Sequence, residues 1–119
     1  MSLRVLVVDD SSMYRELLKV MLEGLGHTLV GEAETGADAV AQFASAKPDL
    51  VTLDISLPDM DGLAVLREIR RSNPRAKVIL VTGNDQGKIV AQARTLGALA
   101  LLVKPFHVEQ LEDALKKAA

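Results

Sequence analysis

Five polar residues stand directly after short aliphatic runs, and they could do chemistry together: Asp9, Asp10, Asp54, Thr82 and Lys104. Crowded carboxylates repel one another, so at neutral pH they take up protons or bind a cation. Several carboxylate oxygens suit a hard ion such as Mg²⁺, which keeps some waters and leaves room for a phosphate. Asp54 could then attack phosphorus and form an acyl phosphate. Mg²⁺ and Lys104 would supply positive charge, and Thr82 a hydroxyl donor.

Each of these residues also has an ordinary explanation. Asp10 could be the N-cap of a helix, Thr82 a turn residue before Gly83, and Lys104 a solvated lysine before a proline. Their joint occurrence at four strand ends favours a functional site over these separate explanations.

The aliphatic runs predict five strands, because they are rich in β-branched residues and do not alternate with polar ones. Such strands are buried on both faces, as in a parallel sheet. The predicted strands are Val5–Val8, Thr28–Val30, Leu50–Leu53, Val78–Val81 and Leu101–Val103.

Helical periodicity separates the strands. In the first helix Met13, Leu17, Met21 and Leu25 step by four residues, with Leu18 and Leu22 widening the stripe, so we expect Met13 and Met21 in the core. Four further helices are predicted around Ala39–Phe43, Leu63–Ile69, Ile89–Leu96 and Val108–Leu115. Five βα units predict an α/β fold, a doubly wound parallel sheet with helices on both faces, formed by residues 1–119 as one domain. Ligands of such sheets bind at the carboxyl ends of the strands, where the five polar residues lie.

The composition excludes several classes of protein. Of the 119 residues 49% are hydrophobic, which argues against disorder, and the absence of cysteine excludes disulfides and cysteine zinc sites. The net charge of −2 comes without a Lys/Arg cluster, so we expect no direct nucleic-acid binding. The apolar runs are too short to span a bilayer, so we expect a cytoplasmic protein with no membrane contact.

Four segments are similar to response-regulator receiver domains of bacterial two-component systems, including stand-alone chemotaxis regulators. They read VLVVDDSSMYR, PDLVTLDISLPDMDGL, VILVTGN and LGALALLVKPF. The resemblance covers essentially the whole chain and implies the strand order 2-1-3-4-5. It also implies a switch that accepts a phosphoryl group from the phosphohistidine of a sensor histidine kinase or phosphotransfer protein. Such a domain is not a turnover enzyme, and loses its phosphoryl group by autodephosphorylation.

The resemblance also assigns roles to the site. Asp54 would be the phosphoacceptor, Asp10 and Asp54 would ligate Mg²⁺ (or Mn²⁺) directly, Asp9 would act mostly through water, and the backbone carbonyl of Ser56 would be a further ligand. Thr82 would be the switch hydroxyl. Lys104 would pair with the phosphoryl oxygens, from a cis Lys104–Pro105 bond.

Two features depart from the usual receiver-domain sequence, and a further pair of residues bears on how long the phosphoryl group persists. Receiver domains usually carry Tyr or Phe where this chain has Leu101, so an aromatic rotamer switch is in doubt. The run Leu99–Leu101 is unusually apolar, so helix 4, strand 5 and helix 5 could form a docking face for a target protein or effector domain; alternatively, Leu99 is a lone exposed leucine. Ser56 and Asn84 are small and polar, which predicts no exceptional phosphoryl lifetime.

Two other functions fit less well. A flavodoxin-like cofactor-binding protein would need a phosphate-binding loop after the first strand, where Asp9 and Asp10 would repel phosphate. A small aspartyl-phosphate phosphatase would place its nucleophile on the first strand. Among the remaining polar residues, we interpret Asp61 as a helix N-cap and Asp59 as a turn residue. We interpret His27 and His107 as surface residues.

Overall fold

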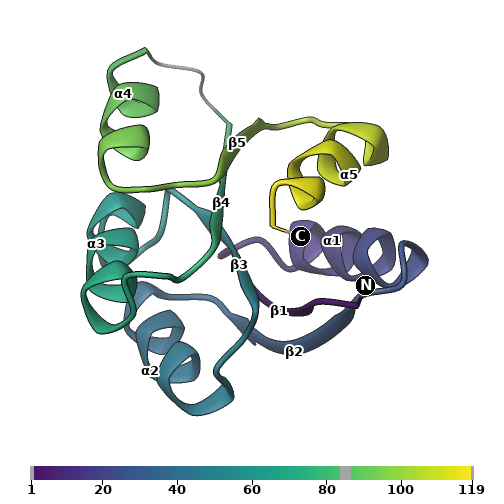
Figure 1. Ribbon diagram of the computed structural model, residues 1–119, viewed down its shortest axis with the longest axis horizontal. Helices are drawn as coiled ribbons and strands as arrows, with labels where there is room; N and C mark the ends of the chain where they lie inside the picture. The colour runs from purple at the N-terminus through teal and green to yellow at the C-terminus, as the bar shows by residue number, and fades with distance from the viewer. Residues whose placement is uncertain (1, 84–86, 119) are drawn as a thin grey trace.

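The computed structural model describes residues 2–83 and 87–118, and within them strands and helices alternate along the chain (Figure 1). The strands are β1 (Arg4–Val8), β2 (Thr28–Ala33), β3 (Leu50–Asp54), β4 (Val78–Thr82) and β5 (Ala100–Val103). The helices are α1 (Ser12–Gly24), α2 (Gly36–Ala46), α3 (Gly62–Ser72), α4 (Gly87–Thr95) and α5 (Val108–Lys116). None of the helices in these ranges is both long and apolar enough to cross a membrane.

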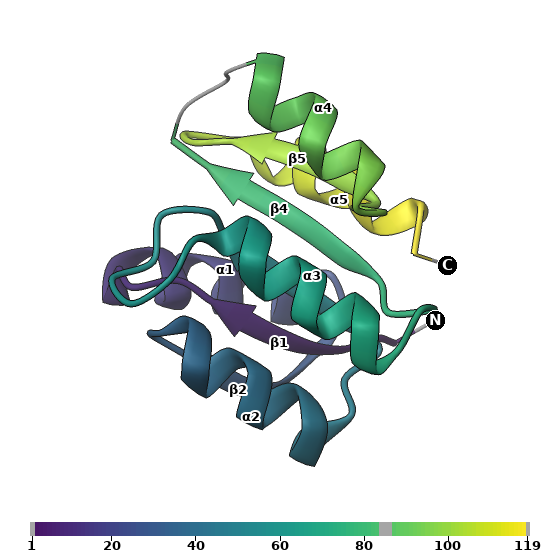
Figure 2. The same ribbon diagram turned by 90° about the vertical axis from the view of Figure 1, so that its left-hand side faces the viewer.

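All strand pairs are parallel, and their order β2-β1-β3-β4-β5 confirms the expected fold. Asp54 pairs with Val81 and Thr82 with Val103, so neighbouring strands end at the same edge. Helices α1 and α5 cover one face of the sheet, and α2, α3 and α4 cover the other (Figures 1 and 2). The three inner strands β1, β3 and β4 are buried along almost their whole length, as their unbroken aliphatic runs predict.

Each face of the sheet has its own aliphatic core. On one face Leu18 and Leu22 of α1 pack with Leu111 of α5 and with Val5 and Ile79 of the sheet. On the other, side chains of α2, α3 and α4 cover the alternate residues of the strands, among them Leu6, Leu53 and Leu80. The site must therefore lie at an end of the sheet, because both faces are closed.

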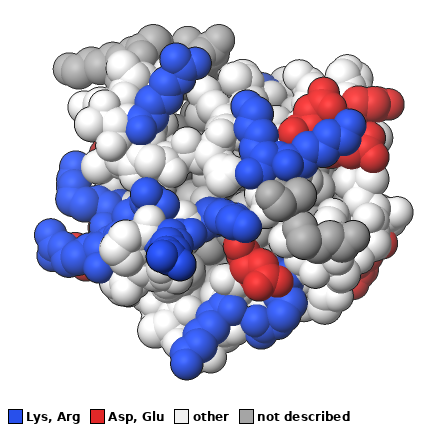
Figure 3. Space-filling view, viewed as in Figure 1, with Lys and Arg blue, Asp and Glu red and all other residues white. Residues whose placement is uncertain are grey.

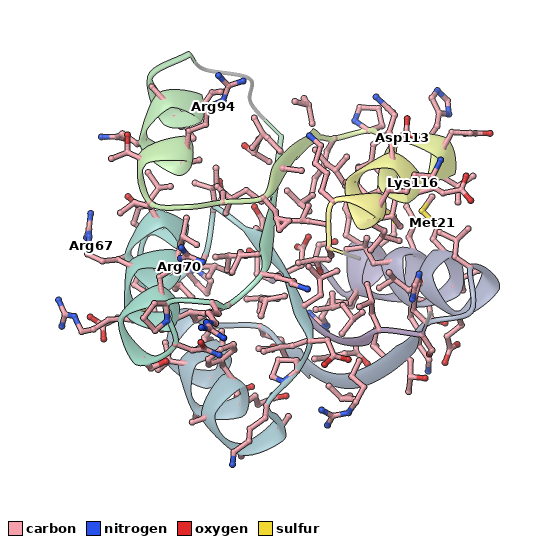
Figure 4. The ribbon with its side chains drawn as sticks, in the orientation of Figure 1. Met21, Arg67, Arg70, Arg94, Asp113 and Lys116 are labelled. Atoms are coloured by element: carbon pink, nitrogen blue, oxygen red, sulfur yellow. The ribbon has the colours of Figure 1, made fainter. Side chains whose placement is uncertain are left out.

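The predicted apolar stripe of α1 is confirmed for Leu18 and Leu22 but wrong for Met13. Met13 is 69% exposed and Leu17 is also exposed, whereas Leu18 and Leu22 are buried. Met21 is half-buried on the side that faces α5 (Figure 4). Apolar residues occupy more than one side of this helix, and the side with Leu18 and Leu22 is the one that packs in the core with the sheet and α5.

The two edge strands also differ from the expectations. β2 continues through the polar Glu32 to Ala33, three residues beyond the predicted end. On β5, Leu101 is half-buried against the α2–α4 core, and Leu99 just before the strand is half-buried against the α1–α5 core. Leu99 is therefore not a lone exposed leucine. Whether the α4–β5–α5 surface docks a partner stays a prediction.

Many charged side chains outside the site have local structural partners. Lys and Arg are spread over several elements of the face in Figure 3, with Asp and Glu among them. In Figure 4 Asp113 and Lys116 lie together on α5, and their atoms Oδ1 and Nζ are 3.7 Å apart. Arg70 of α3 donates to the carbonyl of Ala76 at 2.8 Å. The first contact lies within α5 and the second ties α3 to the segment before β4, and neither builds a basic surface.

Candidate functional site

The loop from β1 to α1 brings two carboxylates to the carboxyl edge of the sheet. Asp9 is fully buried, and its Oδ1 accepts a hydrogen bond from the Ser11 N–H at 2.9 Å. Asp10 is exposed beside it. Ser11, not Asp10, is the N-cap of α1, because its Oγ accepts from the N–H of Tyr14 at 3.3 Å. The cap therefore leaves both carboxylates to the site.

The end of β3 presents Asp54, which is only 4% exposed. Its Oδ1 accepts from the N–H of Ser56 at 3.0 Å. Gly62, at the start of α3, packs so closely that a Cβ there would lie 2.6 Å from the Asp54 carbonyl oxygen. The N–H of Gly62 also donates to the Ile55 carbonyl at 2.8 Å. This close approach fixes the backbone on both sides of Asp54, and only glycine permits it.

Lys104, which follows β5, links the ends of β1 and β3 through its side chain. Its Nζ donates to Oδ2 of Asp9 at 2.8 Å and to Oδ2 of Asp54 at 3.1 Å. The Lys104–Pro105 peptide bond is cis, as the resemblance implied. The backbone N–H of Lys104 donates to the Thr82 carbonyl at 2.7 Å, which ties the end of β5 to the end of β4.

Thr82 is the last residue of β4 and is 3% exposed. Its backbone pairs in register with Val103, one residue before Lys104. All five polar residues singled out in the sequence thus lie at the edge where β1, β3, β4 and β5 end. Asn84, the other residue to which we assigned a tuning role, lies outside the described residues.

The site holds more negative than positive charge. One carboxylate oxygen from each of Asp9, Asp10 and Asp54 lies within 4.8 Å of the others. Burial raises the pKa of Asp54 above its ordinary value of 3.8, although the Ser56 N–H and Lys104 act in the opposite direction. Burial by itself would lower the pKa of Lys104, but its bonds to Asp9 and Asp54 outweigh this and raise it. Lys104 therefore stays an ammonium between carboxylates.

These residues fit the divalent ion that the sequence predicts. Three carboxylates in reach of one another offer hard oxygen ligands, which Mg²⁺ prefers, and one of them, Asp10, opens to solvent. Ser56 is exposed and tied to Asp54 by its N–H, so its backbone lies beside the same cluster. A cation here would relieve the repulsion that a single ammonium leaves uncompensated.

Two residues near the site were missed in the sequence. The ring centroid of Tyr14 lies 4.1 Å from Nζ of Lys104. Arg15 donates to the Asp9 carbonyl at 2.8 Å and forms ion pairs with Glu32 and Glu34 at 3.2 and 3.1 Å. Two features of the sequence could have pointed to Tyr14 and Arg15. Both follow Asp10 within five residues, in the first turn of α1, and Tyr14 is one of only three aromatic residues in the chain.

The other polar residues have structural roles. Asp61 is the N-cap of α3, as predicted, and accepts from the N–H of Leu63 at 3.0 Å. Asp59 does more than form a turn: its carboxylate accepts from the N–H groups of Gly36 and Ala37, and these bonds lower its pKa. His107 is exposed, as predicted for a surface residue.

His27 is half-buried, so its assignment to the surface was wrong. Its Nδ1 accepts from the N–H of Leu3 at 3.0 Å, at the edge of the sheet opposite the site. This bond links the turn before β2 to the residue before β1, and gives the imidazole a structural role.

Comparison with known proteins gives a consistent result. The sequence profile described as "Response regulator receiver domain" matches residues 5–116. Chemotaxis protein CheY of Listeria monocytogenes is 41% identical over 117 residues, 98% of each chain, and that of Thermotoga maritima is 38% identical over 119 residues, 100% of this chain and 99% of the relative. The CheX–CheY–BeF₃–Mg²⁺ complex of Borrelia burgdorferi aligns with a TM-score of 0.91 at 29% identity, covering 94% of this chain and 85% of the other.

Proposed function

The chain belongs to the response regulator receiver domain family, and we propose that it is a phosphoacceptor switch in which Asp54 accepts a phosphoryl group in the presence of Mg²⁺. One observation carries this proposal. Lys104 contacts both Asp9 and Asp54, and Asp10 lies within ligand distance of the same carboxylates. A candidate nucleophile, a carboxylate cluster that could bind a cation and an ammonium thus share one edge of the sheet.

The transfer is a substitution at phosphorus. A carboxylate oxygen of Asp54 forms the new P–O bond, and the bond from phosphorus to the donor breaks. With a phosphohistidine donor the imidazole nitrogen leaves with the bonding electron pair, and with acetyl phosphate the acetate oxygen does. The Asp54 oxygen must be ionised to attack, and the Ser56 N–H and Lys104 favour that form. Bound Mg²⁺ supplies neutralising charge to the phosphoryl oxygens.

The neighbouring residues position and neutralise the group. Lys104 turns from Asp9 toward the phosphoryl oxygens and replaces one ion pair with another. The hydroxyl of Thr82 donates to a phosphoryl oxygen from the end of β4. Asp10 and Asp54 would hold Mg²⁺ (Mn²⁺ could substitute) together with the Ser56 carbonyl, and the buried Asp9 would act mostly through water.

The consequence is a signal and not turnover. The acyl phosphate biases an existing equilibrium between two conformations, and a partner reads the difference. The donor is a histidine kinase or phosphotransfer protein, and the reader a target protein or effector domain that docks on α4, β5 and α5. We place the protein in the cytoplasm, without nucleic-acid or membrane contact of its own.

The test is phosphorylation by acetyl phosphate, followed by intact-protein and peptide mass spectrometry. With Mg²⁺ the wild type is expected to gain one phosphoryl group, on the peptide that contains Asp54. Excess chelator should prevent this, Asp54→Asn should abolish it, and Asp38→Asn, which changes an exposed acid of α2, should not affect it. Phosphorylation that persists in Asp54→Asn would refute the assignment.

A further inference from the structure

Lys104 has a third neighbour besides its two carboxylates. Its ammonium nitrogen lies over the face of the Tyr14 ring, 4.1 Å from the centroid. An ammonium within about 6 Å of a ring centroid is attracted by the negative face of the π-system. Because Lys104 is half-buried here, solvent screens this attraction less than it would at the surface. The Tyr14 ring therefore contacts the same ammonium that donates to Asp9 and Asp54.

The fold places the Tyr14 ring firmly. Tyr14 lies in the first turn of α1, where its backbone N–H is bound by the N-cap Ser11. Its ring packs against that of Phe106, with centroids 6.4 Å apart and planes inclined at 35°. Phe106 is buried in the α1–α5 core two residues after Lys104. The chain's three aromatic residues thus include two that flank the lysine segment.

This arrangement bears on the aromatic residue that the family usually carries at position 101. Leu101 packs into the α2–α4 core, whereas Tyr14 and Phe106 belong to the α1–α5 core on the opposite face of the sheet. The aromatic contact to the site in this chain is therefore made from α1, on the other side of the sheet from Leu101.

We propose that Tyr14 is a positioning residue for Lys104: its ring face holds the ammonium as Lys104 turns from Asp9 to the phosphoryl group on Asp54. This inference rests on the proposed function. The ring restricts the lysine to positions along its face, all of which lie close to the carboxylates. Movement of Lys104 then changes the surroundings of the Tyr14 ring. Because this ring packs against Phe106, the change also reaches the α1–α5 core.

The first experiment measures beryllofluoride binding in the presence of Mg²⁺ by calorimetry. Tyr14→Leu removes the π-face and is expected to weaken binding by about threefold to tenfold, the range of a partly desolvated cation–π contact. Tyr14→Phe keeps the ring without the hydroxyl and should restore affinity to within about twofold of the wild type. Because Leu also loses the ring packing against Phe106, a double-mutant cycle with Lys104 is needed to distinguish this role from space filling.

A double-mutant cycle identifies the partner. In a Lys104→Met background Tyr14→Leu should have no further effect on beryllofluoride affinity, because the ammonium that the ring holds is gone. An equal loss in both backgrounds would show that Tyr14 acts independently of Lys104, and would overturn the inference.

The wild type provides a readout that needs no substitution. Tyr14 is the one tyrosine of a chain without tryptophan, so ultraviolet-excited emission reports on this ring. Addition of beryllofluoride to the Mg²⁺-loaded protein should change the emission intensity, and Lys104→Met should remove the change. If the wild type binds beryllofluoride but its emission and the Leu variant are unaffected, the Tyr14 inference fails and the proposed function stands. If the wild type does not bind, the proposed function fails and the inference fails with it.

Discussion

The two ends of the sheet carry similar numbers of charged groups but use them differently. At the amino end of β1, the N–H of Arg4 donates to the Asp49 carboxylate, and the Asp49 N–H returns a bond to the Arg4 carbonyl, both at 2.8 Å. The Arg4 guanidinium donates to the carbonyls of Ala46 and Lys47, again at 2.8 Å. Both charged side chains there are bound by backbone groups, and these bonds tie the start of β1 to the segment between α2 and β3.

The carboxyl end is not balanced in this way. The ammonium of Lys104 binds Asp9 and Asp54, and Asp10 adds a third carboxylate within 4.8 Å of theirs. Burying like charges together costs stability, so nothing in folding alone favours this arrangement. At the amino end, charged side chains bound by backbone groups stabilise the sheet. At the carboxyl end, three carboxylates in excess over one bound ammonium mark the place where we expect an ion to bind and chemistry to occur.

The largest effect is expected for Lys104→Ala. It removes the ammonium that binds Asp9 and Asp54, and a lost charge-stabilising donor typically lowers a rate by about a hundredfold or more. We expect such a loss in the rate of phosphorylation by acetyl phosphate, with Mg²⁺ binding retained because the carboxylates remain. An unchanged rate in a quenched time course would show that Lys104 only fills space.

The amino end should respond in stability instead. Arg4→Met removes the guanidinium bonds to two carbonyls and is expected to lower the free energy of unfolding by about 1–2 kcal/mol. Phosphorylation should be unaffected. Urea unfolding gives the measurement, and Arg67→Met, at an exposed arginine of α3, is the matched control with little effect. An equal loss in both variants would show that the amino-end pairing is not special.

Removing charge from the carboxyl end should have the opposite sign. The raised pKa of Asp54 means that the folded state holds this proton more tightly than the unfolded chain, so ionisation of Asp54 costs stability. The cost is absent below pH 3.8, grows as the pH rises toward the folded-state pKa, and is constant above it. Asp54→Asn should therefore raise the melting temperature by a few degrees at neutral pH and have no such effect in acid. A variant that melts lower than the wild type at neutral pH would contradict this.

The smallest effect concerns Thr52, which lies on β3 two residues before Asp54. Its hydroxyl is fully buried and has no hydrogen-bond partner among the described residues. Thr52→Val replaces the hydroxyl with a methyl group of similar size, and should leave the free energy of unfolding unchanged or raise it by up to about 1 kcal/mol. A loss larger than this, measured by urea unfolding, would mean that the hydroxyl has an ordered partner.

Much of the carboxyl end could be predicted from the sequence because it depends on local order along the chain. Each site residue follows an aliphatic strand directly, and parallel strands bring such residues to one edge whatever the details of packing. The N-cap Asp61 was predicted for the same reason, since a cap depends on neighbouring residues. The need for glycine at position 62 could not be predicted from the sequence. It arises because the folded backbone of Asp54 and Ile55 lies so close that a side chain is excluded.

The features that were missed depend on which way a helix faces. Met13 and Leu17 fit an apolar stripe as well as Leu18 and Leu22 do, and only packing against the sheet and α5 decides between them. The same rotation of α1 turns Tyr14 toward Lys104 and directs Arg15 to the Asp9 carbonyl. Periodicity defines the spacing of a stripe, but here it does not identify which of two apolar sides is buried.

The charge imbalance at the carboxyl end is tested most directly by titrating the protein with Mg²⁺ in a calorimeter. We predict that the wild type binds one Mg²⁺, that Asp10→Asn and Asp54→Asn each weaken binding at least tenfold, and that Asp49→Asn at the amino end does not. Absence of Mg²⁺ binding by the wild type, or equal binding by all four proteins, would contradict the account.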